Sequence, residues 1–277
     1  MNTKYPLGPA SLLLVLTLSL LCLSSCRLST SHANFTKVDS TRLPDCEALI
    51  VDFPIDVKVH VGERTAIVFD PEMPEQVRRE LELRTDGKAL LITSRKEQTG
   101  FGRFLGRWSR KGAKAEVWVT SLRGLELGSS ARAQLVDSIT TPSLRLILSG
   151  ASTLTGLRLS AGKFLFSSAG ASVASGRVSV DEACQLELEG ASSARFEGYV
   201  DELKMELKGA STLKAPELQG RVVSVELSGA STAHIGAMEA LSYALSYALS
   251  GASRLSYRGR PVLGERSVTG ASSVSAD

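Results

Sequence analysis

The 277-residue sequence has few of the side chains from which catalytic and metal sites are usually built. Histidine occurs three times and cysteine four times, which leaves little material for a His/Cys metal cluster or a histidine-dependent triad. Aromatic residues make up only 5% of the chain, whereas glycine occurs 24 times. This composition favours thin layers of small side chains joined by tight turns. It indicates neither a cofactor nor a metal site.

Charge and hydrophobic runs are also limited. The formal net charge is +3, so overall electrostatics indicate no nucleic-acid partner. The apolar run Leu12–Leu23 is too short for a comfortable membrane span, and Lys4 precedes it. The run leads into Leu23-Ser24-Ser25-Cys26, which resembles a bacterial lipobox. We therefore expect residues 1–25 to be a lipoprotein signal peptide and Cys26 to carry acyl chains that bind a membrane. The alternative is an ordinary signal peptide with a chance cysteine.

One phrase recurs through the second half of the chain. Gly-Ala-Ser begins at Gly150, Gly170, Gly190, Gly209, Gly229, Gly251 and Gly270. Successive glycines are 20, 20, 19, 20, 22 and 19 residues apart. A fixed period near 20 predicts a solenoid, in which each unit buries its apolar face only by stacking on its neighbours.

The residues before each glycine alternate with period two, as in Leu144-x-Leu146-x-Leu148. This alternation predicts strands, and 20 residues accommodate about three short strands and three turns rather than a strand and a helix. Positions two, four and six before the glycine form apolar columns that face inward. The sequence therefore predicts an all-β fold, a parallel β-helix of about 20 residues per coil.

The serine of each phrase recurs with no histidine and no Gly-x-Ser-x-Gly pattern, so we expect structural serines whose hydroxyls form a ladder rather than nucleophiles. A weaker eighth match, Gly128-Ser129-Ser130, has Leu125 and Leu127 shifted by one residue. That shift predicts a bulge or a different corner.

The preceding part of the chain lacks the phrase. Residues 26–34 are small and polar, as expected of a tether. Residues 35–94 contain short strand-like runs, a hairpin turn at Asp86-Gly87 and one short helix near Pro74. We expect an antiparallel, strand-rich N-terminal module covering one end of the coils, which themselves occupy residues 115–277.

A family resemblance follows from these features. The opening Phe35-x-x-Val38, the run Ile55-x-Val57-x-Val59-x-x-Gly62 and the run Asp86-Gly87-x-x-Leu90-x-Ile92 precede the Gly-Ala-Ser coils. In this order they resemble the GIN-type head domain of auto-transporter adhesins, a family of unknown function common among Bacteroidetes lipoproteins. The resemblance spans residues 35–274. It implies a right-handed β-helix and a cell-envelope location, and it supplies no catalytic residue.

Residues 95–114 form a basic and aromatic segment. Seven basic residues stand against one acid, Glu97. Charge for attraction and rings for stacking predict contact with an anionic glycan or lipid headgroup. The alternative is a solvated hairpin loop. The candidate binding residues are Arg103, Phe104, Arg107, Trp108, Arg110 and Lys111.

A second candidate site is the outward column three residues before the glycine, where Glu187, Glu206 and Glu226 fall on successive coils. Carboxylates about 5 Å apart repel one another, so the ladder could bind a cation or act on a saccharide. The alternative is neutralisation by Lys204 and Lys208. Cys46 and Cys184 could pair in an oxidising compartment, although Cys184 falls in an inward column, as a buried thiol would.

Together these features predict a lipid-anchored envelope protein with an adhesin-like binding or scaffolding role and no catalytic activity. Its partners would be the membrane, through Cys26, and an anionic glycan or other envelope component, but not nucleic acid. The absence of an acidic run after Cys26 favours the periplasmic face of the outer membrane over the cell surface. The alternative is a glycan-active lyase or hydrolase that uses the glutamate ladder.

Overall fold

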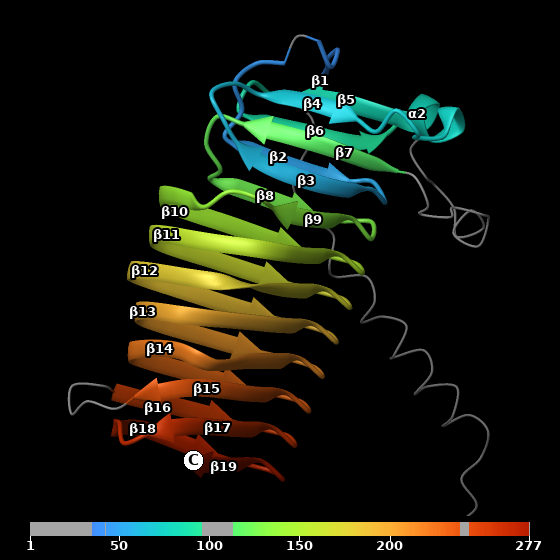
Figure 1. The fold of residues 1–277 in the computed structure, drawn as a ribbon. Helices are drawn as coiled ribbons and strands as arrows, with labels where there is room; N and C mark the ends of the chain where they lie inside the picture. Colours follow the sequence, from blue (N-terminus) through green and yellow to red (C-terminus); the bar gives the residue numbers. More distant parts are fainter. Residues whose placement is uncertain (1–34, 42, 96–112, 239–243, 277) are drawn as a thin grey trace, which may run out of the picture. The chain divides into compact units, whose positions relative to one another are not determined.

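A computed structural model of the chain describes residues 35–41, 43–95, 113–238 and 244–276. Its strands stack as parallel coils of about 20 residues, which confirms the predicted β-solenoid (Figure 1). The repeating part runs from β8 to β19. Its strands are β8 Gly124–Leu127, β9 Arg132–Leu135, β10 Ile139–Leu148, β11 Thr153–Ser168, β12 Val173–Leu188, β13 Ser193–Leu207, β14 Thr212–Leu227, β15 Thr232–Met238, β16 Ala244–Leu249, β17 Arg254–Gly259, β18 Val262–Val268 and β19 Ser273–Ala276.

A central coil is one bent strand closed by one Gly-Ala-Ser turn, rather than three separate strands. β11 and β12, for example, pair in parallel from Thr153↔Val173 to Ser168↔Leu188, with irregularities after Leu154 and Ala161. Such bulges bend a strand without ending it. Each coil therefore has two outward surfaces. We call the surface of the residues just before a Gly-Ala-Ser turn the pre-turn face, and that of the residues just after it the post-turn face.

The predicted apolar columns fill the interior. On the pre-turn side Leu146, Phe166, Leu186, Met205 and Val225 are all fully buried, and consecutive members are register partners. Phe196 meets Phe164 and Phe166 edge to face across coils, with centroids 5.2 Å apart for Phe166 and Phe196. One apolar core therefore runs through successive coils, as stacking of incomplete units requires.

The serines are buried as expected, but their bonding differs from the predicted ladder. Ser152, Ser172, Ser192, Ser211, Ser231 and Ser253 are each at most 1% exposed. Each hydroxyl donates to the carbonyl three residues earlier, as Ser211 does to Lys208 O at 2.6 Å. The hydroxyl thus closes its own turn, because that carbonyl is the nearest acceptor.

The apparent one-residue slip at the first coil is resolved by a different corner. Leu125 and Leu127 are in register with Leu146 and Leu148. Ser129 takes the place that glycine holds in later coils, and Ser129 and Ser130 both have positive φ, 47° and 67°. A changed turn, rather than a slipped strand, accounts for the shift.

The N-terminal strands continue the stack, and their order in it differs from their order in the sequence. These elements are β1 Thr36–Lys37, β2 Ala48–Asp52, β3 Asp56–Val61, β4 Ala66–Phe69, α2 Glu75–Glu80, β5 Leu81–Thr85, β6 Ala89–Ser94 and β7 Lys114–Val119. β2 pairs in parallel with both β6 and β8, and β3 with both β7 and β9. The β2–β3 coil therefore lies between the β6–β7 and β8–β9 coils.

Antiparallel pairing, predicted for the whole N-terminal module, is found only at its outermost strands. β5 pairs antiparallel with β6 and β1, and β4 with β7. The turn at Asp86-Gly87 forms as predicted, with Asp86 accepting from the Lys88 and Ala89 amides and Gly87 at φ 88°. No helix among the described residues is long and apolar enough to cross a membrane.

Candidate functional site

The structure places the three glutamates of the predicted ladder in consecutive register on the pre-turn face. Glu187 is the register partner of Glu206, and Glu206 of Glu226. Lys208 forms an ion pair with Glu206 and lies 3.9 Å from Glu189. The hydrogen bond and negative charge of Glu206 raise the pKa of the Lys208 ammonium. Lys208 therefore stays charged and offsets the repulsion within the ladder.

The remaining contacts of the ladder are also local. Gln185 donates a hydrogen bond to Glu187, whereas Lys204 forms no ion pair with another described residue. Among the described parts of the chain, no group of three or more His, Cys, Asp or Glu side chains is arranged to hold a metal ion. The glutamates are thus a partly neutralised stripe on an open surface.

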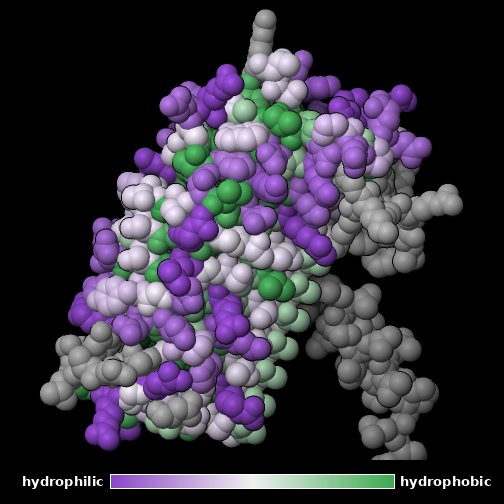
Figure 2. Space-filling view, in the orientation of Figure 1, coloured by the Kyte–Doolittle hydropathy of each residue, from purple (hydrophilic) through white to green (hydrophobic). Residues whose placement is uncertain are grey.

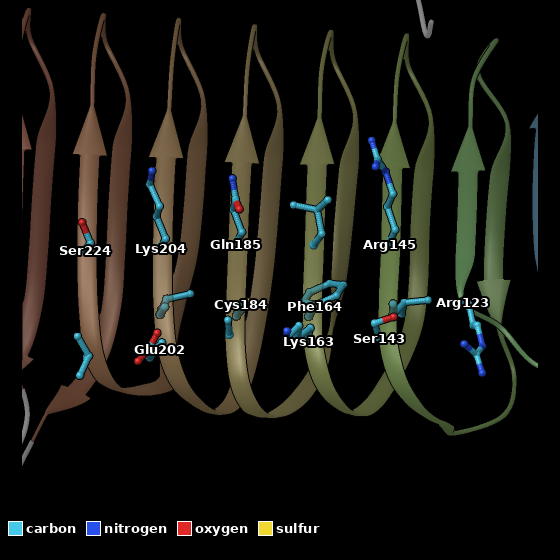
Figure 3. Close-up of a pocket in the computed structure, with 15 residues that line it drawn as sticks. Arg123, Ser143, Arg145, Lys163, Phe164, Cys184, Gln185, Glu202, Lys204 and Ser224 are labelled. Carbon is cyan, nitrogen blue, oxygen red and sulfur yellow. The ribbon is translucent and has the colours of Figure 1, made fainter. Parts of the chain in front are cut away.

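A shallow groove of about 600 Å³ crosses the pre-turn face beside this stripe. Figure 3 shows Arg145, Gln185, Lys204 and Ser224 in a row across β10, β12, β13 and β14. Leu165 completes the row by register. Arg123 and Lys163 at the margin form ion pairs, with Glu47 at 3.5 Å and with Glu182 at 3.4 Å. The groove is mixed in character, with an apolar floor and both charges at its rim.

A half-buried aromatic and acidic cluster lies where β3, β7 and the β9–β10 corner meet. His60 stacks on Trp118 with ring centroids 4.9 Å apart, and its Nδ1 lies 3.3 Å from Asp137 Oδ2. That carboxylate also accepts a hydrogen bond from the Val61 amide. Since Asp137 holds both the ring and the backbone, the cluster fixes the corner of the first coils.

Both cysteines of the described chain are free and buried. Cys184 belongs to β12 and Cys46 precedes β2. Burial raises the pKa of each thiol, so neither is an activated nucleophile.

Several predicted site residues lie outside the described residues. They are the lipidation candidate Cys26 and the loop residues Arg103, Phe104, Arg107, Trp108, Arg110 and Lys111. Their roles remain predictions.

The post-turn face carries a column that the sequence reasoning missed. Arg195, Lys214 and His234 are consecutive register partners on β13, β14 and β15. Each follows the glycine of its coil by five residues. Alignment of the coils by the residues that follow the glycine would have predicted this column. Figure 2 shows hydrophilic side chains spread over successive coils of one face of the molecule.

The comparisons with known proteins can be set beside this geometry. The family described as "Putative auto-transporter adhesin, head GIN domain" matches residues 47–261. The chain belongs to this family. The predicted resemblance is thereby confirmed, and the match covers the described coils from β2 to β17. Membership of this adhesin-like family indicates a protein of the cell envelope or cell surface.

Solved structures share the fold of this GIN-domain chain. A "putative lipid binding protein" from Parabacteroides distasonis is 15% identical with a TM-score of 0.69, covering 88% of this chain and 96% of its own. A "putative adhesin" from the same organism is 14% identical with a TM-score of 0.66, covering 88% and 95%. A "putative adhesin" from Parabacteroides merdae is 13% identical with a TM-score of 0.63, covering 88% and 94%. No curated protein matches the sequence.

Proposed function

We propose that this GIN-domain protein is a lipid-anchored, non-catalytic envelope protein that binds or scaffolds an envelope component through the outer faces of its coils. The observation that carries the proposal is the repeated register of outward side chains. Side chains of similar chemistry recur at one-coil intervals on both faces, as in the glutamate stripe and in the column of Arg195, Lys214 and His234. Such columns suit an extended ligand or a neighbouring surface better than a small substrate.

Two further features support a binding role over catalysis. A glycan hydrolase of the usual type needs one protonated and one ionised carboxyl group facing a single bond. The ladder instead holds Glu206 in an ion pair with Lys208 and Glu187 in a hydrogen bond with Gln185. The hydroxyls of the buried turn serines donate hydrogen bonds to carbonyls of their own turns. These buried hydroxyls are therefore not presented to a substrate.

The proposed membrane attachment and the proposed binding role of segment 95–114 rest on the sequence. Acyl chains on Cys26 would hold the protein at the outer membrane, with the periplasmic face favoured. The basic and aromatic residues of segment 95–114 would contact an anionic glycan or lipid headgroup.

A binding screen tests the proposal. The purified protein would be applied to immobilised glycans and to vesicles of neutral or anionic phospholipid. A variant with Arg103, Arg107, Arg110 and Lys111 changed to Gln would be tested in parallel. We expect saturable binding by the parent protein. Binding that is lost in the variant would assign the site to the loop, and binding that persists would assign it to the coil faces. Failure of the folded protein to bind any glycan or vesicle would contradict the proposal.

A further inference from the structure

The column Arg195, Lys214 and His234, which we call the basic ladder, lies on the post-turn face of three successive coils. Arg195 is the register partner of Lys214, and Lys214 of His234. Arg195 and Lys214 are exposed, and His234 is half-buried. Neighbouring backbones in a sheet are about 4.8 Å apart. Two permanently positive side chains therefore project into solvent one coil apart, with an imidazole on the next coil.

No acidic side chain of the described chain forms an ion pair with Arg195 or Lys214. The acids that follow them along their strands lie beyond a bulge between Arg195 and Glu197. One of them, Glu197, is already bound by Arg177 at 2.8 Å. Like charges at opposite register positions destabilise a sheet. The basic ladder thus differs from the glutamate stripe, whose repulsion Lys208 offsets within the chain.

A column of hydroxyl groups runs beside the basic ladder. Two residues before each ladder residue stand Ser193, Thr212 and Thr232, which are also consecutive register partners. Since successive outward positions on a strand lie two residues apart, each residue of the basic ladder has a hydroxyl next to it on the same face. His234 Nδ1 is hydrogen-bonded to Ser256 Oγ on the following coil. This bond orients the imidazole at the end of the ladder.

These two columns define the chemistry of a partner. Cations at one-coil intervals match a chain with acidic groups at regular intervals, and the hydroxyls match hydroxyl or ring-oxygen groups between them. A single small anion would contact only one residue of the basic ladder. We propose that the basic ladder is the binding site for an acidic polysaccharide that lies across the coils. This proposal rests on the proposed binding function and names the class of its ligand.

A second copy of the chain is the strongest competing occupant, because its glutamate stripe repeats at the same one-coil interval. The stripe is less suited to this role. Glu206 is already paired with Lys208 and Glu187 with Gln185, and both contacts would have to break. The hydroxyl column would also remain unused in a carboxylate-to-cation interface. The free polysaccharide fits both columns.

The test compares two double variants of matched composition. Arg195→Gln with Lys214→Gln removes two charges from the basic ladder. Arg64→Gln with Lys88→Gln removes one exposed arginine and one exposed lysine from turns between the N-terminal strands, where neither forms an ion pair with a described residue. Affinity of the purified protein for polygalacturonate, dextran sulfate, neutral dextran and single-stranded DNA would be measured at low and at physiological salt.

We expect the parent protein to bind at least one of the two acidic polysaccharides, more weakly as salt rises, and not to bind neutral dextran. The ladder variant should lose about tenfold in affinity, because each exposed charge contact contributes modestly. The control variant should bind nearly as well as the parent. At low salt the ladder variant should also unfold at an equal or slightly higher temperature, since repulsion is relieved. That result would show that lost binding is not lost folding.

Four results would overturn the proposal. Equal losses in the two variants would show attraction to net charge alone. Tighter binding of DNA than of either polysaccharide would indicate a different polyanion. Salt-sensitive self-association abolished only in the ladder variant, with polysaccharide binding unchanged, would assign the ladder to a second copy. A parent protein that binds neither acidic polysaccharide, yet binds a neutral glycan or a vesicle, would reject the ladder site while leaving the proposed binding function intact.

Discussion

At each Gly-Ala-Ser turn the glycine has φ between 69° and 78°, a region that side chains with a Cβ adopt at a cost. The coil stacking adds a second constraint. A Cβ on Gly170 would lie 2.4 Å from the carbonyl oxygen of Gly150 in the coil before it. That carbonyl also accepts the Ala171 amide at 2.7 Å. Glycine is therefore required both by the turn and by the distance between coils.

Gly170→Ala should lower stability much more than Gly87→Ala. Gly87 also has positive φ, 88°, but nothing lies within 4 Å of the position its Cβ would take. The control should cost about 1 kcal/mol for the backbone conformation alone, and Gly170→Ala at least twice as much. Urea unfolding followed by circular dichroism would measure both. Equal midpoints would mean that the coils separate easily enough to accept a methyl group.

The buried serines allow a second comparison at the residue scale. Ser211 donates to Lys208 O at 2.6 Å, whereas the buried Ser168 hydroxyl has no hydrogen-bond partner among the described residues. Ser211→Ala should destabilise by about 1 kcal/mol or more, because it leaves a turn carbonyl without its donor. Ser168→Ala should be neutral or stabilising, since it removes an unsatisfied hydroxyl. Thermal unfolding of the two variants would decide, and a larger loss at Ser168 would contradict this account.

At the scale of the element, β18 differs from the strands β8 to β17 of the repeating part. All seven of its residues are exposed, and within the described chain it pairs only with β16. Arg266 stands in the inward column, as the register partner of Tyr247. A charged residue at an inward position of an outer strand is a known way of preventing edge-to-edge association. Arg266 thus ends the inward column of Tyr247, whereas the neighbouring inward columns continue into the exposed Leu263 and Val268.

Arg266→Leu should therefore promote self-association. The change extends the apolar column to the outer edge while the backbone groups of β18 remain available for pairing. Arg254→Leu on β17 is the control, because it also replaces an exposed arginine but at an outward position. Sedimentation velocity over a range of concentrations should show larger species for Arg266→Leu alone. Two variants that sediment alike would show that the inward charge does not protect the edge.

At the scale of the whole molecule, the two ends of the described stack are built differently. β4 and β5 pair antiparallel with the outer N-terminal coil and β1 pairs antiparallel with β5, whereas β18 and β19 add one more parallel layer. The N-terminal coils also contain the inserted β2–β3 layer, so contacts between distant parts of the sequence hold that end together. The faces between the two ends carry the repeated columns on which the proposed function depends.

The membrane attachment is a prediction for the intact protein. Cys26→Ser should move the protein from the membrane fraction to the soluble fraction, because acyl chains cannot be attached to serine in this way. Cys184→Ser is the control for a general effect of losing a thiol, since Cys184 is buried within β12. Fractionation and immunoblotting would measure the distribution. Membrane retention of the Cys26→Ser protein would show that something other than the lipid holds it there.

Much of the candidate site could be located from the sequence because the repeat converts sequence position into spatial position. Glu187, Glu206 and Glu226 are spaced by one coil, and their register follows directly. Which lysine neutralises the charges of these glutamates could not be predicted from the repeat. Lys204 and Lys208 were both expected to contribute, and only Lys208 forms the ion pairs. Which of two neighbouring lysines turns toward a carboxylate depends on side-chain geometry that the repeat does not encode.

The sequence by itself determined the coil. A glycine every 20 residues and period-two alternation of apolar residues allow only parallel stacking with one inward face, since a slip of one residue would expose the whole apolar column. The tertiary structure alone decided the position of β2–β3 between β6–β7 and β8–β9. These N-terminal strands lack the repeated phrase, so many parallel and antiparallel partners suit their alternation equally well. Only the assembled core, in which β2 and β3 each pair with a strand on both edges, selects among them.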